Sequence, residues 1–291
     1  MDGILIVNKP KGCTSHDVVA EIRKMLDIKK VGHTGTLDPN ATGVLPLLLN
    51  KGTQISKYLI EHDKEYEVTL KLGTITDTLD SEGNILEEKE VKEEILEKTN
   101  IEKVINSFIG KQEQIPPIYS AIKVNGKKLY EYARKGESIK IEPRKIEIYN
   151  INLLKIDKKE KQIIFKVECS KGTYIRSLCK DIAERLGTIG YMKELKRVKV
   201  GKFKIQDAVT LEDLKNNIKN EEYINEKIIT IEEFFKDYEK IELSENKLNH
   251  FLNGVKISIN KEEGLYNIYS NKKYIGIGIA NKNLLKRDII L

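Results

Sequence analysis

Polar and apolar residues alternate along several stretches of the chain, and the period of each stretch predicts a strand. The apolar run 4–7 predicts a short strand. From 65 to 73 an apolar residue occupies every second position, beginning at Tyr66, which predicts a strand with one buried face. The ranges 146–156 and 162–169 also read as strands, and we expect them to form an antiparallel pair.

Other stretches carry helical signals. A threonine and a serine at positions 14 and 15 can cap a helix that extends to about residue 26, because apolar residues follow them at helical spacing. The range 54–60 is expected to be helical, and 92–108 is expected to be a charged amphipathic helix. The segment 172–176 leads into a further helix that extends to about residue 186.

The pattern changes after about residue 235, where short strand-like runs recur. We therefore expect a catalytic-sized domain over 1–235 and a small, separate β domain over 236–291. The runs that predict this β domain are 254–259, 265–270, 274–280 and 287–291.

Composition narrows the class of protein only mildly. The net charge of +6 favours a polyanionic partner, but just seven of the 51 basic residues are arginine, and isoleucine and asparagine are plentiful. Such a bias towards lysine is typical of genome-wide drift. The three cysteines form no C-x-x-C pair and the four histidines are scattered, so we expect neither a disulfide framework nor a metal site. Without a signal peptide or an apolar run near 18 residues, we expect a soluble cytoplasmic protein with no membrane segment.

The segment 32–43 is the strongest candidate for chemistry. It combines glycines, an imidazole, hydroxyls and one carboxylate, Asp38, and is too polar and glycine-rich for a core. Pro39 restrains Asp38 to an extended backbone, which places the carboxylate on a stiff loop. A carboxylate can act there as nucleophile or base without a cofactor. On these residues alone, a surface turn explains the segment equally well.

Three other residues could support such an acid. Arg176 stands out in a lysine-rich chain, and its planar fork could hold Asp38 ionised, although it could equally be a surface residue at a helix start. Tyr66 would by default pack in the core, but a neighbouring arginine could stabilise its phenolate. His33, between glycines, cannot hold much core, and its ring on a mobile loop would suit stacking on a nucleobase.

Two lysine-rich segments have few acids nearby and are candidate phosphate contacts. One is the turn at 123–128 and the other is the range 196–204. The residues that we expect to contact an RNA backbone are Lys123, Lys127, Lys128, Lys196, Arg197, Lys199, Lys202 and Lys204.

These motifs occur in an order that resembles the bacterial tRNA pseudouridine synthases of the TruB type, which modify the uridine at position 55 in the TΨC arm. The resemblance covers roughly residues 3–215. It is carried by Lys9-Pro10 after a strand, the glycine-rich segment 32–43, Lys64-Glu65-Tyr66, the proline-containing segment 116–121, the range 128–134, and the segment 170–176 that ends in Arg176.

The resemblance implies an α+β fold, with a mixed, largely antiparallel sheet flanked by helices and a small C-terminal β domain of PUA type. It implies an isomerase that uses no cofactor, that binds tRNA, and that needs no obligate protein partner; we expect a monomer. The roles carried over are catalysis for Asp38, Tyr66 and Arg176, and stacking on the target base for Tyr66 as well. They also include extrusion of the target nucleotide for His33, lining of the uridine pocket for Tyr174 and Leu195, and support of the active-site loop for Lys9 and Pro10.

Several alternatives stay open on the sequence. Asp38 could attack the ribose, attack uracil C6 or abstract a ribose proton. A guide-RNA-dependent relative would normally bring a fuller PUA domain and partner surfaces. A non-catalytic tRNA-binding module or chaperone is the main alternative of another class, although Asp38, Tyr66 and Arg176 are all present. A nucleoside hydrolase is disfavoured because no aspartate cluster for Ca²⁺ lies near the N-terminus.

Overall fold

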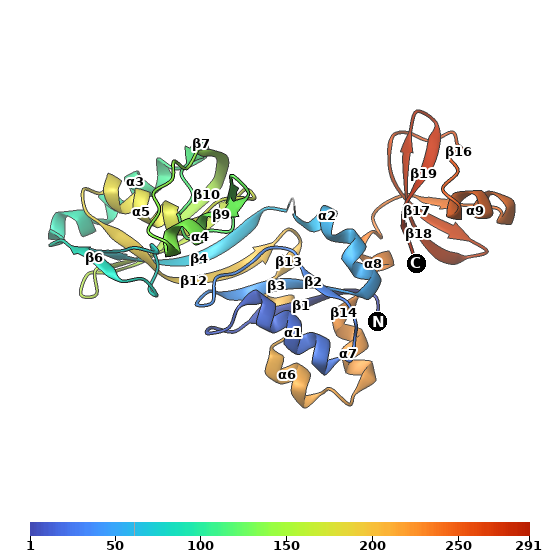
Figure 1. The fold of residues 1–291 in the computed structure, drawn as a ribbon, viewed down its shortest axis with the longest axis horizontal. Coiled ribbons are helices and arrows are strands. Elements are labelled where there is room, and N and C mark those ends of the chain that lie inside the picture. The colour runs from blue at the N-terminus through green and yellow to red at the C-terminus, as the bar shows by residue number, and fades with distance from the viewer. Residues whose placement is uncertain (61) are drawn as a thin grey trace.

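One long mixed sheet organises most of the molecule in the computed structural model, which describes residues 1–60 and 62–291 (Figure 1). Within those residues β3 and β12 pair in parallel and the other neighbours in this sheet pair antiparallel, which confirms the expected mixed, largely antiparallel sheet. The strand order is β14 (Ile228–Ile229), β1 (Gly3–Lys9), β3 (Thr42–Leu49), β12 (Gly190–Val200), β4 (Lys64–Leu72), β11 (Gln162–Cys169), β10 (Arg144–Asp157) and β7 (Gly110–Gln114), with β2 (Val31–His33) on β3 and β13 (Phe203–Lys204) on β12.

Short helices cover the sheet. They are α1 (Ser15–Met25), α2 (Ser56–Ile60), α3 (Lys98–Asn106), α4 (Leu129–Arg134), α5 (Ile175–Arg185), α6 (Leu211–Asn216), α7 (Glu221–Lys227) and α8 (Ile231–Phe234), with 3-10 turns at Asn50–Ile55, Glu93–Leu96 and Ile205–Asp207. The expected cap of α1 is confirmed: the Thr14 hydroxyl accepts from the Asp17 amide at 3.1 Å, and the Asp17 carboxylate accepts from the Thr14 amide at 2.8 Å.

The helix expected over 92–108 is broken at Glu97, whose backbone is extended (φ −70°, ψ 131°). Leu96 and Ile101 lie on either side of the break and are both buried in the same apolar core. Five positions apart on one helix, these two side chains would point in directions about 140° apart. The extended residue therefore lets both reach the core.

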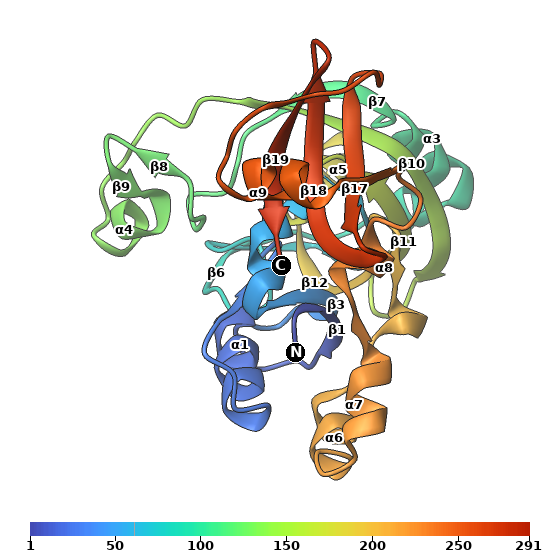
Figure 2. The same cartoon turned by 90° about the vertical axis from the view of Figure 1, so that its right-hand side faces the viewer.

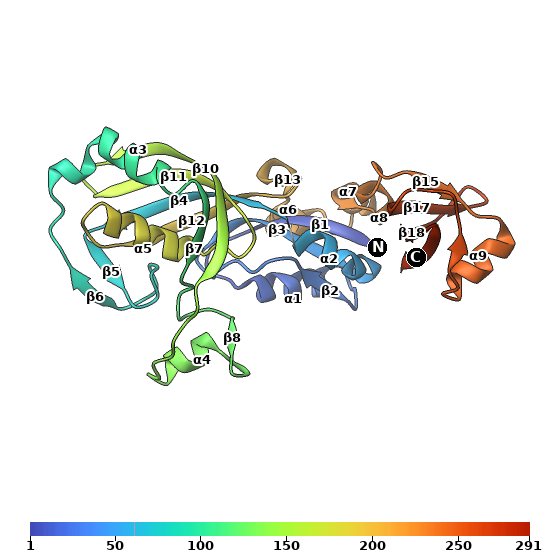
Figure 3. The same cartoon turned by 90° about the horizontal axis from the view of Figure 1, so that it is seen from above.

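Helices pack on the sheet over two of its apolar cores. One is formed where α3 and α5 pack on β4, β10, β11 and β12, and the other where α1 packs near β1 and β3 (Figure 3). The alternation predicted for β4 is confirmed, because Tyr66, Val68, Leu70 and Leu72 are all buried. Strands β10 and β11 form the antiparallel pair that the sequence predicts.

A second sheet occupies the C-terminal end of the chain, as the change of pattern predicts. Its order is β15 (Lys240–Glu242), β17 (Gly264–Ser270), β18 (Lys273–Asn281), β19 (Leu284–Ile290) and β16 (Ile257–Ser258), with helix α9 (Glu245–Leu252) beside it. The sequence analysis did not foresee β15 or α9. Ile277 and Ile289 pack into an apolar cluster with Ile4, and the Tyr58 hydroxyl donates to Asp288 at 2.5 Å, which joins this sheet to the larger one. The domain boundary at 235/236 and the PUA assignment stay predictions.

Two small hairpins complete the fold. Strands β5 (Thr74–Thr76) and β6 (Ile85–Glu88) frame a polar loop. Strands β8 (Lys123–Val124) and β9 (Lys127–Lys128), followed by α4, project from the body of the molecule in two views (Figures 2 and 3). In the described part of the chain, no helix has the length and apolar character needed to cross a membrane.

Candidate active site

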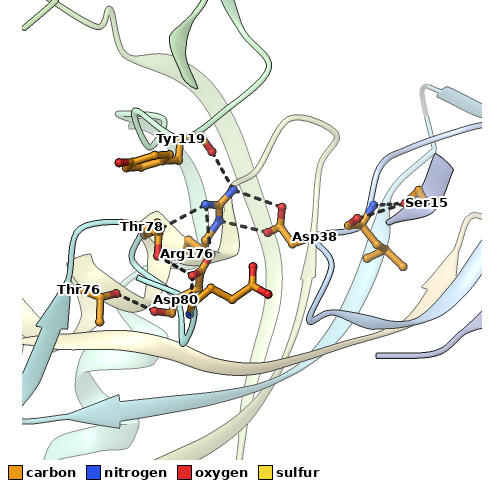
Figure 4. A network of polar contacts seen from close by, with 9 residues as sticks. Ser15, Asp38, Thr76, Thr78, Asp80, Tyr119 and Arg176 are labelled. Carbon is orange, nitrogen blue, oxygen red and sulfur yellow. Dashed lines mark hydrogen bonds and ion pairs between the residues drawn. The ribbon is translucent and has the colours of Figure 1, made fainter. Parts of the chain in front are cut away.

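The loop between β2 and β3 holds Asp38 by anchoring the residues on both sides of it. The Ser15 hydroxyl accepts from the Leu37 amide at 2.9 Å and donates to the Leu37 carbonyl at 3.2 Å (Figure 4). The ammonium of Lys9, fully buried, donates to the Pro39 carbonyl at 3.0 Å and to the Pro10 carbonyl at 2.9 Å. Lys9 and Pro10 thus lie where the resemblance expects support for the loop, and hydrogen bonds anchor the loop on both sides of Asp38.

Arg176, in the first turn of α5, contacts Asp38 through two nitrogens. Its Nε lies 3.2 Å from Oδ2 and its Nη2 lies 3.4 Å from Oδ1, so the pairing expected across the chain is confirmed (Figure 4). The Tyr119 carbonyl accepts from Nη2 at 3.1 Å and the Thr78 carbonyl accepts from Nη1 at 3.2 Å. Such bonds fix the plane of the guanidinium, and hence the direction from which it meets Asp38.

A second carboxylate, Asp80, also contacts Arg176, with Oδ2 3.3 Å from Nη1. Its other oxygen accepts from the Thr78 hydroxyl at 2.5 Å and from the Glu82 amide at 3.1 Å. The sequence analysis missed this residue, because the loop carries several acids and nothing local distinguishes one of them. Arg176 is therefore shared between two carboxylates, each held by its own loop.

Burial raises the pKa of the Asp38 carboxyl, and Asp80 raises it further, whereas Arg176 and Lys9 oppose the rise. The Asp38 side chain is 36 % exposed, against 9 % for Arg176, so the carboxylate faces open space while its cation lies behind it. Asp38 is therefore accessible to a substrate, while Arg176 compensates the negative charge of its carboxylate.

Asp38 lines a cavity of about 740 Å³, within the range of ligand sites. Tyr66, Tyr174 and Leu195 line the same cavity, as the resemblance implies for a uridine pocket. Gln114 holds Tyr174 in place, since its side chain accepts from the Tyr174 amide at 2.8 Å and donates to the Tyr174 carbonyl at 3.0 Å. The basic residues on the cavity wall are Lys64, Arg144, Lys145, Lys171, Arg176 and Arg197.

His33 lies in a strand and not on the mobile loop that we expected. It ends β2, where it pairs with Leu47 of β3 and is half buried. The cavity wall begins at the next residue, Thr34. Burial lowers the pKa of His33, with Arg197 adding to the effect, so its ring is neutral near pH 7.

The basic range 196–204 is not the single exposed cluster that we expected. Arg197 is 1 % exposed and points into the protein, which is incompatible with a phosphate contact at the surface. Lys199 is neutralised by Glu168 at 3.1 Å, and Lys202 donates to the Phe234 carbonyl at 2.8 Å. Lys196, Lys202 and Lys204 are exposed. The difference arises because β12 ends at Val200 and β13 begins at Phe203, so the range spans the ends of two strands whose side chains turn to different sides.

The turn at 123–128 is better placed for RNA. Lys123 and Lys127 are exposed on the projecting hairpin. Lys128 is half buried and its ammonium lies 3.2 Å from the Tyr130 hydroxyl.

Over the described residues, no group of three or more His, Cys, Asp or Glu side chains is arranged to hold a metal ion.

Comparisons with known proteins identify relatives of the whole chain. The family model described as TruB family pseudouridylate synthase, N-terminal domain, matches residues 23–175, and that of the tRNA pseudouridylate synthase B C-terminal domain matches residues 176–241. The curated tRNA pseudouridine synthase B of Clostridium tetani is 47 % identical over 98 % of both chains. The protein of that name from Caldanaerobacter subterraneus subsp. tengcongensis is 46 % identical, over 96 % of this chain and 95 % of its own.

Solved structures of similar fold support the same relationship. A chain from an H/ACA ribonucleoprotein bound to a substrate RNA containing 2′-deoxyuridine superposes with a TM-score of 0.71 at 25 % identity, over 99 % of this chain and 85 % of that one. A chain from a Cbf5-Nop10-Gar1 complex gives 0.70 at 28 % identity, over 99 % and 83 %. The ordered motifs, the anchored Asp38 and these matches lead to one assignment: the chain belongs to the TruB family of pseudouridylate synthases.

Proposed function

We propose that this chain converts uridine to pseudouridine in tRNA, at position 55 of the TΨC arm. The observation that carries the proposal is the Asp38–Arg176 pair on the wall of a cavity that also holds Tyr66 and Tyr174. The name shared by the curated relatives, tRNA pseudouridine synthase B, supports tRNA as the substrate. Position 55 rests on the resemblance of the motifs.

The reaction is an isomerisation. The C1′–N1 bond of uridine breaks, the uracil rotates, and a C1′–C5 bond forms, while the proton lost from C5 is balanced by one gained at N1. No oxidant or reductant is consumed, so the chemistry requires no cofactor. Each route open to Asp38, namely attack at C1′, attack at C6 or removal of a ribose proton, needs its ionised carboxylate. Arg176 and Lys9 both favour that form.

The target base must leave its stack to reach Asp38, at a cost of roughly a few kcal/mol. The aromatic side chains of Tyr66 and Tyr174 and the apolar side chain of Leu195 line the cavity, and such side chains suit stacking against a base. Once flipped out of the stack, the base would be held beside the carboxylate of Asp38. His33, one residue outside the wall, is proposed to assist the extrusion.

Phosphate contacts offset the cost of flipping. We place them at the exposed Lys123 and Lys127 on the hairpin and at Arg144 and Lys145 on the rim of the cavity. These contacts would fix the position of the tRNA while carrying little sequence information. We propose that the chain acts as a monomer without an obligate protein partner, unlike the assemblies that contain its structural neighbours.

Mapping pseudouridine at single-nucleotide resolution tests the function. Purified protein is incubated with an unmodified tRNA transcript and with a matched transcript that carries cytidine at position 55. Pseudouridine at position 55 of the first transcript alone is the expected result, and Asp38→Asn should make none. Tight binding of the wild-type protein without any pseudouridine would instead establish the alternative, a catalytically inactive tRNA-binding module.

A further inference from the structure

Arg197 is a buried cation at the floor of the active site. It is 1 % exposed, lines the cavity, and pairs with Tyr66 across strands β12 and β4. Residues directly opposite each other in an antiparallel pair project to the same face. Among the described residues, no carboxylate lies within ion-pair distance of Arg197, unlike Arg176, which has two.

Three segments meet at its guanidinium. The Val44 carbonyl accepts from Nε at 2.8 Å, the Gly35 carbonyl accepts from Nη2 at 3.1 Å, and the Tyr66 hydroxyl forms a side-chain hydrogen bond with it. Gly35 adopts φ +124°, and a Cβ there would lie 3.4 Å from Nη1. The arginine therefore holds the loop that carries Asp38, and its pairing with Tyr66 across β12 and β4 places the phenol oxygen within its reach.

A charge buried without a carboxylate partner is costly, and an apolar side chain would fill this strand position without that cost. Carbonyls and a phenol oxygen satisfy its donors but do not neutralise it. The pKa of Tyr66 is raised by burial to about 12, and Arg197 opposes the rise, so at neutral pH the phenol keeps its proton. The charge of Arg197 therefore acts on the protonated hydroxyl of Tyr66.

The direction of the hydrogen bond follows from chemistry. Arginine has five N–H donors and no acceptor, so the Tyr66 oxygen accepts from Arg197. The O–H hydrogen of Tyr66 must then point away from the guanidinium. Because Tyr66 lines the cavity, that leaves its hydrogen free to meet a bound ligand.

We propose that Arg197 is a positioning residue that turns the Tyr66 hydroxyl into an oriented hydrogen-bond donor for the flipped base. The positive charge behind the oxygen polarises the O–H bond and strengthens the bond donated to a uracil oxygen. Arg197 acts through Tyr66 and does not touch the base. This inference rests on the proposed function.

A double-mutant cycle tests the inference. Single-turnover rates at saturating tRNA are measured for wild type, Arg197→Met, Tyr66→Phe and the double variant. With Tyr66 present, Arg197→Met should slow the reaction by roughly 30-fold or more, a loss of the size seen for groups that assist catalysis. In the Tyr66→Phe background the same change should cost about threefold or less, because no hydroxyl remains to be oriented. The tRNA Kd should stay within about twofold of wild type in all four proteins.

The opposing role is purely structural, with Arg197 merely holding the Gly35 loop and Val44. That role would make Arg197→Met equally harmful in the wild-type and Tyr66→Phe backgrounds, and this result would overturn the proposal. If Arg197→Met fails to fold, Arg197→Lys takes its place in the cycle, since it keeps the charge but loses the planar fork. Arg185→Met, at an exposed arginine packed on Phe108, is the matched control and should leave the rate unchanged.

The wild-type rate in the same assay distinguishes a failure of this inference from a failure of the proposed function on which it rests. A wild-type protein that forms no pseudouridine would overturn both. A wild-type protein that turns over, combined with equal losses in the two backgrounds, would overturn only the role of Arg197.

Discussion

Replacing Arg176 and replacing Asp80 should move the pH dependence of catalysis in opposite directions. Burial and Asp80 raise the pKa of Asp38, whereas Arg176 lowers it. Arg176→Met removes the lowering influence, so the acid limb of the pH–rate profile should move to higher pH. Asp80→Asn removes a raising influence, so the limb should move to lower pH. Both variants should be slower near neutral pH, because Arg176→Met removes the guanidinium that orients Asp38 and Asp80→Asn loosens it.

The two variants should also differ in stability. Arg176→Met leaves Asp80, 12 % exposed, and Asp38, 36 % exposed, without their shared cation. Breaking a buried pair by removing one partner costs about 3–5 kcal/mol, and the exposure of Asp38 places this case near the lower end. At about 2–4 °C per kcal/mol, the melting temperature should fall by roughly 6–12 °C. Asp80→Asn keeps a hydrogen-bond acceptor beside Arg176 and should lose less.

Single-turnover release of tritium from tRNA carrying C5-tritiated uridine measures the rate, because C5 exchanges its hydrogen for the bond to C1′. The profile is recorded at saturating tRNA from acidic to neutral pH, with melting curves at each pH. Lys180→Met is the matched control: it removes a cation from the same helix, α5, where Lys180 pairs with Glu184 at 3.0 Å away from the cavity. Its profile should match the wild type.

Limbs that move in the same direction in both variants would refute the electrostatic reasoning. An unchanged melting temperature in Arg176→Met would show that the pair contributes nothing to folding. A wild-type acid limb at the pH of an ordinary aspartate, near 3.8, would contradict the raised pKa of Asp38.

The remaining predictions concern single side chains. Asp38→Asn should bind tRNA but form no pseudouridine. Because the pKa of Asp38 is higher folded than unfolded, its ionised form destabilises the fold at neutral pH, so this variant should melt at the same temperature as wild type or higher, with the advantage shrinking in calorimetry as the pH falls towards 3.8. Tyr66→Phe keeps the ring and should lower the single-turnover rate far more than affinity; an unchanged rate would restrict Tyr66 to packing or stacking. Lys127→Gln should raise the tRNA Kd and flatten the log-affinity against log-salt slope by about 0.7–0.9, whereas Lys199→Gln should alter neither, and tRNA titrations at several salt concentrations decide both.

Sequence reasoning succeeds here where a property is local. The Asp38 loop follows from Pro39 and its glycines, the start of α1 from the Thr14 cap, and β4 from its alternation. Each depends on residues a few positions apart. For the Asp38–Arg176 contact, across a much longer separation, the residues alone left a surface arginine equally possible, and the resemblance to one family favoured the pairing.

Sequence reasoning fails where partners are distant or a strand is irregular. Asp80 is one of several acids in a polar loop, and only the folded position of Arg176 distinguishes it. Arg197 was grouped with its lysine neighbours because the range 196–204 is basic and contains no acid, and the irregular pairing of β12 could not be foreseen. Two register shifts interrupt its pairing with β4, so Arg197 and Val198, adjacent in sequence, are both buried.

The position of β12 explains why the site's groups converge. It pairs in parallel with β3 and antiparallel with β4. It therefore lies between β3, the strand after the Asp38 loop, and β4, the strand that carries Tyr66. The parallel pair brings Gly43 against Arg197, where a Cβ on Gly43 would lie 2.1 Å from the Arg197 carbonyl oxygen. Gly43 also adopts φ +107°, which favours glycine. The glycines of this segment helped to mark it as a candidate for chemistry. At Gly43 the requirement comes instead from the sheet: the glycine admits β12, and β12 places Arg197 beneath Tyr66.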